Sequence, residues 1–159
     1  MRVRKVRRQR QAKPDYFFGS MVVTKLINRV MRQGKKSVAE KHIYKAFELI
    51  KEKTKQNPVE VLERALANIA PQMEVRSRRV GGAAYQVPMP VRQRRGSSLS
   101  IRWLIQEANK RPNKDYHTFA DKLAAEIMAA ANNEGGAITR KITAHKMADA
   151  NKAFAHFRW

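Results

Sequence analysis

Seven arginines fall within the segment from Val75 to Gln106, and no aspartate or glutamate stands among them. They are Arg76, Arg78, Arg79, Arg92, Arg94, Arg95 and Arg102. The planar guanidinium group binds a phosphate through two parallel hydrogen bonds and also stacks on exposed bases. Because a solvated charged surface usually mixes both signs, this one-signed segment favours contact with a nucleic acid.

The first thirteen residues form a second basic segment. They hold seven positive charges and no acid: Arg2, Arg4, Lys5, Arg7, Arg8, Arg10 and Lys13. Over all 159 residues, 34 Lys and Arg stand against 13 Asp and Glu, a formal net charge of +21 with pI ≈ 11.0. Since charge of one sign destabilises a compact chain, we expect a polyanionic partner, either nucleic acid or an anionic membrane surface.

The sequence lacks the residue patterns typical of catalytic and cofactor-binding sites. The absence of cysteine excludes disulfides, thiolate metal sites and cysteine nucleophiles. The string Gly34-Lys35-Lys36-Ser37 resembles the end of a phosphate-binding loop, but Arg29 stands where that loop needs its first glycine. The histidines lack the spacing of metal ligands; they are His42, His117, His145 and His156. We therefore expect neither an enzyme nor a cofactor or metal site.

The chain also lacks the patterns of membrane insertion and secretion. No apolar run approaches the length of about 18 residues that a membrane span needs. The basic start leads into no apolar region, which argues against a secretory signal. An organellar transit peptide is the less favoured alternative, because the segment is rich in arginine but short and without serine.

The spacing of apolar residues predicts a mainly α-helical single domain of about six helices over residues 14–159, after a basic arm over residues 1–13. Ser20 is expected to cap the first helix and Gly34 to end it. Residues 35–37 would then connect it to the second helix.

Asn57 followed by Pro58 predicts the start of a third helix, which Pro71 ends. Later helices are expected around Leu99 to Ala108, around Phe119 to Ala131, and from a Thr139 cap to roughly Ala155, with a C-terminal helix and tail over about residues 139–159.

Between the third and fourth helices the apolar period changes from helical to two. This alternation predicts a two-stranded β-hairpin over about residues 72–91 with a tip at Gly81-Gly82. Pro88 and Pro90 cannot donate ladder hydrogen bonds, so the second strand must be an edge. Because two strands alone are marginally stable, we expect the hairpin to protrude and to be stabilised by a partner.

Two features allow more than one interpretation. The glycines of the tip either let the backbone approach RNA closely or simply make the turn, and Tyr85 either faces RNA or packs on the hairpin. At the chain end, Phe154, Phe157 and Trp159 are expected to tie the last helix to the core, with a partner-protein or RNA-stacking contact as the alternative.

Several strings resemble the family of small-subunit ribosomal protein seven, of bacterial and organellar type. They are Ser77–Ala83, Tyr85–Pro88, Gly34–Ser37, Leu99 with Arg102–Leu104, Met147–Ala148 and Ala150–Trp159. The resemblance runs from about Pro14 to Trp159. It departs from the family pattern at Tyr16–Gly19, where a further proline or polar residue is common, and at Tyr116–Phe119, where the family usually has a helix start rich in Met and Arg.

The resemblance implies a helical domain with a protruding hairpin and a structural, non-catalytic role without a cofactor. It implies primary binding to the head (3′ major domain) of small-subunit ribosomal RNA, nucleation of head assembly, and a place near exit-site tRNA and mRNA. Other implied neighbours are the ninth and eleventh small-subunit proteins. A cytoplasmic ribosome is expected rather than an organellar one, and no membrane.

By position, the resemblance also assigns residues to these contacts. Those expected to bind ribosomal RNA are Arg2, Arg4, Lys5, Arg7, Arg8, Arg10, Lys35, Lys36, Arg76, Arg78, Arg79, Arg92, Arg94, Arg95 and Arg102. Those expected to lie toward tRNA and mRNA are Gly81, Gly82, Tyr85, Arg140 and Lys141.

Two other classes of protein compete with this interpretation. A DNA architectural or repressor protein would place the hairpin arginines in a groove of the duplex, and it is the main alternative. A membrane-surface binder needs a basic amphipathic helix whose apolar side has no core to cover. Each apolar stripe here already has partner helices, so this class ranks last.

Overall fold

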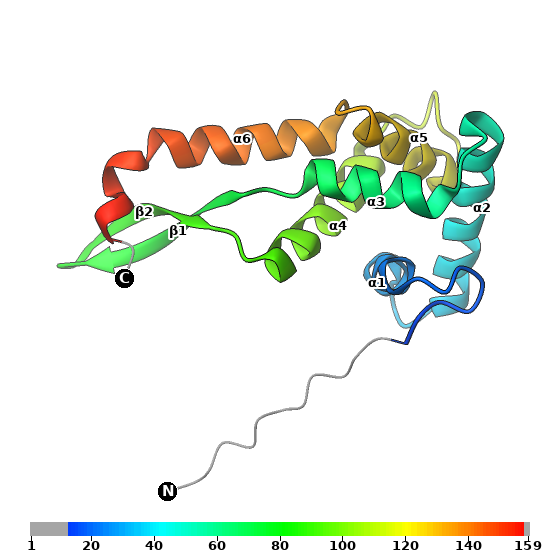
Figure 1. Cartoon of the computed structure of the whole chain (residues 1–159), viewed down its shortest axis with the longest axis horizontal. Coiled ribbons are helices and arrows are strands. Elements are labelled where there is room, and N and C mark those ends of the chain that lie inside the picture. Colours follow the sequence, from blue (N-terminus) through cyan, green and yellow to red (C-terminus); the bar gives the residue numbers. More distant parts are fainter. Residues whose placement is uncertain (1–12, 158–159) are drawn as a thin grey trace, which may run out of the picture.

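The computed structural model describes residues 13–157, which fold into a helical body with a long hairpin (Figure 1). In chain order the elements are α1 (Met21–Val30), α2 (Lys36–Thr54), α3 (Pro58–Ile69), β1 (Met73–Val80), β2 (Ala83–Pro90), α4 (Gln93–Lys110), α5 (Phe119–Ala131), α6 (Gly136–Ala150) and the 3₁₀ helix η1 (Lys152–Phe157). The predicted mainly helical fold, with a hairpin between the third and fourth helices, is confirmed. None of the helices in this range is both long and apolar enough to cross a membrane.

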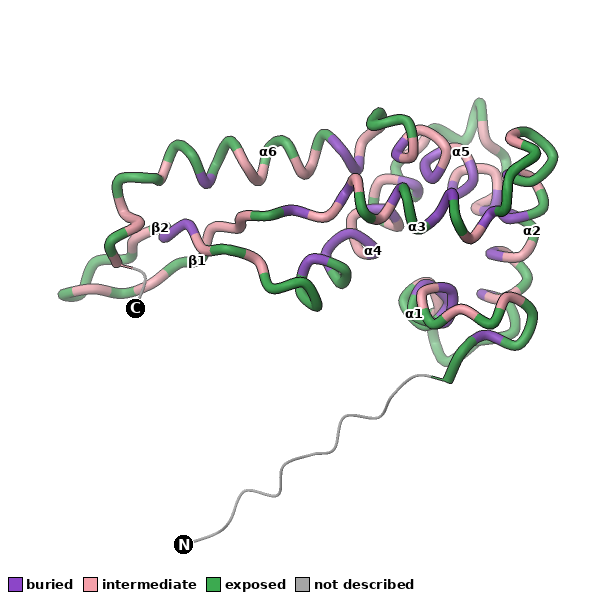
Figure 2. The backbone as a smooth tube through the Cα atoms, in the orientation of Figure 1, coloured by how far each residue is buried: buried purple, intermediate pink, exposed green. Residues whose placement is uncertain are grey.

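Helices α1 to α5 share one hydrophobic core, to which the start of α6 also contributes. Its largest fully buried side chains include Phe47, Leu62, Leu104, Leu123 and Ile127. Figure 2 shows the buried residues concentrated in this helical body and sparse along the hairpin. The hydrophobic core therefore lies in the helical body, from which the hairpin extends.

The hairpin is antiparallel, and its register runs from Met73 opposite Pro90 to Val80 opposite Ala83. Gly81 and Gly82 form the tip with φ of 57° and 90°. Positive φ at both central residues is the geometry of a type I′ turn, whose twist matches that of the flanking strands. The glycines therefore make the turn, as one of the two interpretations expects.

The C-terminal part of the chain stabilises the hairpin. Helix α6 extends from the helical body alongside the strands (Figure 1) and contacts both of them. Beyond it, the ring centroids of Phe154 and Phe157 lie 5.3 Å and 5.1 Å from the ring centroid of Tyr85 on β2. At the base of the hairpin, the backbone N–H of Gln72 donates to Nε2 of His145 on α6 at 3.0 Å.

These contacts bear on two expectations from the sequence. Within the chain, α6 and η1 already pack along the hairpin, and stabilisation by a separate partner stays a prediction. Phe154 and Phe157 tie the chain end to the hairpin rather than to the core, and Tyr85 packs on the hairpin side of this contact. Trp159 lies outside the described residues.

Two helix boundaries also differ from prediction. Helix α2 begins at Lys36, so Lys36 and Ser37 belong to its first turn and not to the connection. Helix α6 begins at Gly136 instead of at a Thr139 cap, and it ends at Ala150. The Thr139 hydroxyl donates to the Gly135 carbonyl at 3.1 Å. Thr139 thus lies inside the helix, bonded back to the preceding turn.

The segments where the sequence departs from the family pattern have ordinary local structure. Residues 15–19 form a turn around the Asp15 carboxylate, and Ser20 then caps α1 by accepting from the N–H of Val22. Thr118 and Asp121 form a reciprocal capping box at the start of α5. Both departures therefore lead directly into predicted helices.

Candidate nucleic-acid interface

A hollow between α1 and α4 brings three cationic side chains together. Lys25 and Arg29 come from α1 and Arg94 from α4, while Asn28, Ser97 and Ser98 supply amide and hydroxyl groups. All three cations are exposed, and none forms an ion pair with an acid of residues 13–157. Unpaired cations beside neutral hydrogen-bonding groups are the chemistry that binds phosphate oxygens. We call this hollow the α1–α4 groove.

Of these three cations, the sequence pattern predicts only Arg94 as an RNA contact; Lys25 and Arg29 are not among the predicted residues. These two residues are spaced i, i+4 on α1, opposite the buried stripe of Val23, Leu26 and Ile27. That spacing shows that they share one exposed side. Only the packing of α1 against α4 shows that this side meets the start of the helix carrying Arg94.

Two of the seven hairpin-region arginines are held by an acid that stands just before their segment. Glu74 on β1 accepts from Nε of Arg76 at 2.6 Å and from Nε of Arg95 at 3.2 Å. The carboxylate thereby links the base of the hairpin to the first turn of α4. Both guanidinium side chains remain about half exposed, 54% and 44%, so they stay accessible at the surface.

The other arginines of this region have different surroundings. Arg79 and Arg92 are exposed, and within the described part of the chain neither pairs with an acid. Arg78 is partly buried opposite Tyr85 in the hairpin register. Arg102 is also partly buried on α4, and its Nε has no hydrogen-bond partner among the described residues. The structure therefore separates the arginines that face solvent from those that pack.

The predicted contacts before the hairpin fall at the start of α2 and in the N-terminal arm. Lys35 precedes α2 and lines a hollow with Arg29 and Arg32. Lys36 forms an i, i+4 ion pair with Glu40 at 3.1 Å, yet its side chain is 56% exposed. The arm residues lie outside the described part of the chain: Arg2, Arg4, Lys5, Arg7, Arg8 and Arg10.

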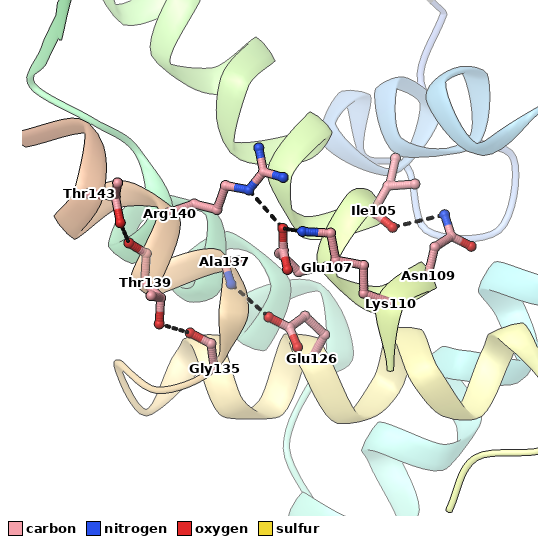
Figure 3. Close-up of polar contacts among 10 residues, drawn as sticks. All are labelled: Ile105, Glu107, Asn109, Lys110, Glu126, Gly135, Ala137, Thr139, Arg140 and Thr143. Carbon is pink, nitrogen blue, oxygen red and sulfur yellow. Dashed lines mark hydrogen bonds and ion pairs between the residues drawn. The ribbon is translucent and has the colours of Figure 1, made fainter. Parts of the chain in front are cut away.

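Arg140 and Lys141 make contacts within the protein. Arg140 Nε donates to Oε1 of Glu107 on α4 at 2.7 Å, an oxygen that also accepts from Lys110 Nζ at 2.9 Å (Figure 3). Lys141 Nζ donates to the carbonyl of Asn68 near the end of α3 at 2.7 Å. Both residues thus fix α6 on the helical body, and their closeness to tRNA and mRNA stays a prediction.

Glu107 gives this junction a pH dependence. Burial raises the pKa of its carboxyl, but the hydrogen bonds and positive charges of Lys110 and Arg140 outweigh burial and leave the pKa below its usual value of 4.5. A lowered folded-state pKa contributes stability that is present above pH 4.5 and is lost as the pH falls through the folded value. The link between α4 and α6 should therefore weaken in acid.

We expect Glu107→Gln to reduce the free energy of unfolding at neutral pH but to make little difference in acid, where the wild-type carboxyl is protonated. Urea unfolding of both proteins, once at neutral pH and once well below pH 4.5, measures the difference. An equal loss at both pH values would show that the ion pairs do not carry the effect.

Two of the histidines make contacts within the protein. His145 accepts the Gln72 hydrogen bond described above, and the ring of His42 meets the ring of Phe119 edge-on at 6.0 Å. Across residues 13–157, no group of three His, Asp or Glu side chains is placed to hold a metal ion.

A helical body that carries exposed cations on α1, on the start of α4 and on a long hairpin has the character of a nucleic-acid-binding protein. Residues 1–152 match the family model described as ribosomal protein S7p/S5e, and the chain belongs to that family. The resemblance inferred from the sequence is confirmed. The chain is a protein of the ribosome and not an enzyme.

Curated relatives agree over almost the full length. The small ribosomal subunit protein uS7 of Caldicellulosiruptor bescii is 56% identical over 152 residues, which covers 96% of each chain. Those of Heliobacterium modesticaldum and Thermoanaerobacter sp. are each 56% identical over 151 residues, covering 95% of both chains. These relatives are bacterial and carry the name of a small-subunit protein, so this chain belongs to the small subunit.

Proposed function

We propose that the protein binds small-subunit ribosomal RNA through the α1–α4 groove, the exposed arginines of α4 and the hairpin. The observation that carries this proposal is the gathering of Lys25, Arg29 and Arg94 without an acidic partner in residues 13–157. RNA phosphates would supply the missing counter-charge. Affinity would come mainly from phosphates, and specificity from RNA shape and a few splayed bases.

The RNA in this proposal is the head of the small subunit, whose assembly the protein would nucleate. The same family resemblance supports a position near exit-site tRNA and mRNA and beside the ninth and eleventh proteins, in a cytoplasmic ribosome. The hairpin is suited to such a position, because α6 holds it extended away from the helical body (Figure 1). Its tip can then contact molecules that the helical body does not reach.

Salt dependence tests the electrostatic part of the proposal. If the protein contacts six to ten phosphates, its affinity for a head-domain RNA fragment should fall roughly 10³–10⁵-fold between 50 and 200 mM salt, on the calibration for duplex DNA. Filter binding across that range measures the slope. An affinity that does not change with salt would overturn the proposal.

Competition tests the identity of the nucleic acid. The head-domain fragment should displace bound label more effectively than duplex DNA at equal phosphate concentration, and more effectively than RNA of equal length from another domain. A clear preference for duplex DNA would instead support an architectural or repressor protein.

A further inference from the structure

Two adjacent aromatic side chains stand on the surface near the start of the fold. Tyr16 is 94% exposed and Phe17 is 72% exposed. Both belong to the segment in which the sequence departs from the family pattern. Neither side chain is needed to fill the core, where Phe18 instead packs its ring 5.0 Å from that of Phe47. Both rings are therefore available for a contact outside the core.

The turn that carries these rings is held by Asp15. Its buried carboxylate accepts hydrogen bonds from the backbone N–H groups of Phe17 and Phe18, each at 3.2 Å, and from the Tyr44 hydroxyl at 3.0 Å. Burial, that hydrogen bond and the Asp15 charge raise the pKa of Tyr44 to about 12, so the hydroxyl remains a donor at neutral pH. The backbone is thus ordered before a ligand arrives, which lowers the entropy cost of binding.

The rings border a hollow that also contains cations. Tyr16, Phe17 and Tyr44 line it together with Lys13, Lys36 and Asn28. Two acids line it as well. Asp15 is occupied by the turn, and Glu40 pairs with Lys36. Lys13 is exposed and has no acidic partner among the described residues.

This combination matches the two halves of a nucleotide. Exposed aromatic faces stack on unpaired bases, while nearby ammonium groups bind the phosphates that flank them. A protein partner would need an apolar surface ringed by acids to match the same chemistry. Six further Lys and Arg stand among residues 1–12, and the net charge of +21 favours RNA over such a partner.

We propose that Tyr16 and Phe17 form a stacking surface for an unpaired base of ribosomal RNA, with Lys13 binding the adjoining phosphate. The inference rests on the proposed function and adds a contact to it.

The test compares the full-length protein with its Tyr16→Ala/Phe17→Ala variant on the head-domain RNA fragment. One lost stacking contact should weaken binding about 5- to 100-fold. The slope of affinity against salt should not change, because the rings carry no charge and release no counterions. The matched control is Ile142→Ala/Met147→Ala, which removes two exposed apolar side chains of α6 and should leave affinity within about twofold.

Two further variants test whether a loss of binding comes from the missing rings or from a change in folding. Phe17 contacts the Tyr44 ring at 5.1 Å, so Tyr16→Ala alone provides a milder test. Tyr16→Phe/Phe17→Tyr keeps both faces and should bind like the wild type. If both alanine variants bind the RNA as tightly as the wild type, the inference is overturned, and the rings would instead be a contact for a protein partner.

A loss of affinity together with a shallower slope of affinity against salt would also overturn the inference. It would mean that the substitution had disturbed the contact between lysine and phosphate rather than a stacking contact. Failure of the wild type itself to prefer the head-domain fragment would defeat the proposed function, and this inference with it. That result is distinct from any change confined to the variants.

Discussion

Replacing Glu126 by alanine is expected to lower the free energy of unfolding by about 3–5 kcal/mol. The side chain is 1% exposed, and both of its oxygens accept hydrogen bonds. Oε2 accepts from Nε of Arg111 at 2.8 Å, and Oε1 accepts from the backbone N–H of Ala137 at 2.9 Å (Figure 3 shows the Ala137 contact). One carboxylate of α5 thereby joins the end of α4 to the first turn of α6.

The size of the effect follows from what the substitution leaves behind. The Arg111 side chain, which is only 21% exposed, would keep its hydrogen bond to the Tyr116 hydroxyl but lose its only acidic partner among the described residues. The buried N–H of Ala137 would lose its acceptor. An unsatisfied buried donor costs about 1–3 kcal/mol, and more when it is charged. Glu126→Gln should cost less, because its amide oxygen can still accept from Ala137.

Urea unfolding at neutral pH measures these differences. Glu134→Ala is the matched control, since it removes an exposed acid from the loop between α5 and α6 and should change stability by no more than about 0.5 kcal/mol. A loss below about 1 kcal/mol for Glu126→Ala would show that water replaces the carboxylate at this junction.

The parts of the fold that the sequence predicts well are those with local causes. Asn57 accepts from the N–H of Val59 and Pro58 opens α3, as their adjacency predicts. The hairpin register likewise follows from Gly81-Gly82 and the alternation on either side. Each of these signals lies within a few residues of the element that it determines.

The start of α6 has a cause that lies far away in the sequence. Its first turn is capped by Glu126, eleven residues before the bonded N–H of Ala137. Gly135, with φ of 92°, allows this approach, because a Cβ atom there would lie 3.1 Å from Oε1 of Glu126. The sequence suggests Thr139 as the N-cap of α6, because threonine is a favoured N-cap residue. The acceptor for the first turn is instead the Glu126 carboxylate on α5.

The same distinction explains the outcome for the charged residues. Sequence shows which residues are cationic but not which acid or carbonyl each one meets. Arg140 and Lys141 resemble free surface cations until α6 packs on the body and gives them Glu107 and the Asn68 carbonyl. Nothing in the sequence near Lys25 and Arg29 predicts a binding site, because the groove forms only when α1 packs beside α4.

The double substitution Arg29→Ala/Arg94→Ala is expected to weaken binding to head-domain RNA by about 100-fold or more. Hydrogen bonds to charged groups contribute about 1.5–3 kcal/mol each, and the variant removes one such donor from each side of the α1–α4 groove. Losing two phosphate contacts should also lower the salt slope by about 2 on the duplex-DNA calibration. Both side chains are exposed, so stability should change little.

A matched control separates a specific groove from general charge. Lys53→Ala/Arg64→Ala also reduces the net charge by two, but it removes exposed cations from the last turn of α2 and from α3, which do not line the groove. If total charge drives binding, both variants should lose affinity equally. If the groove binds phosphates, only Arg29→Ala/Arg94→Ala should show the full loss and the shallower slope. Equal losses would therefore contradict the groove as the principal site, because only position distinguishes the two pairs.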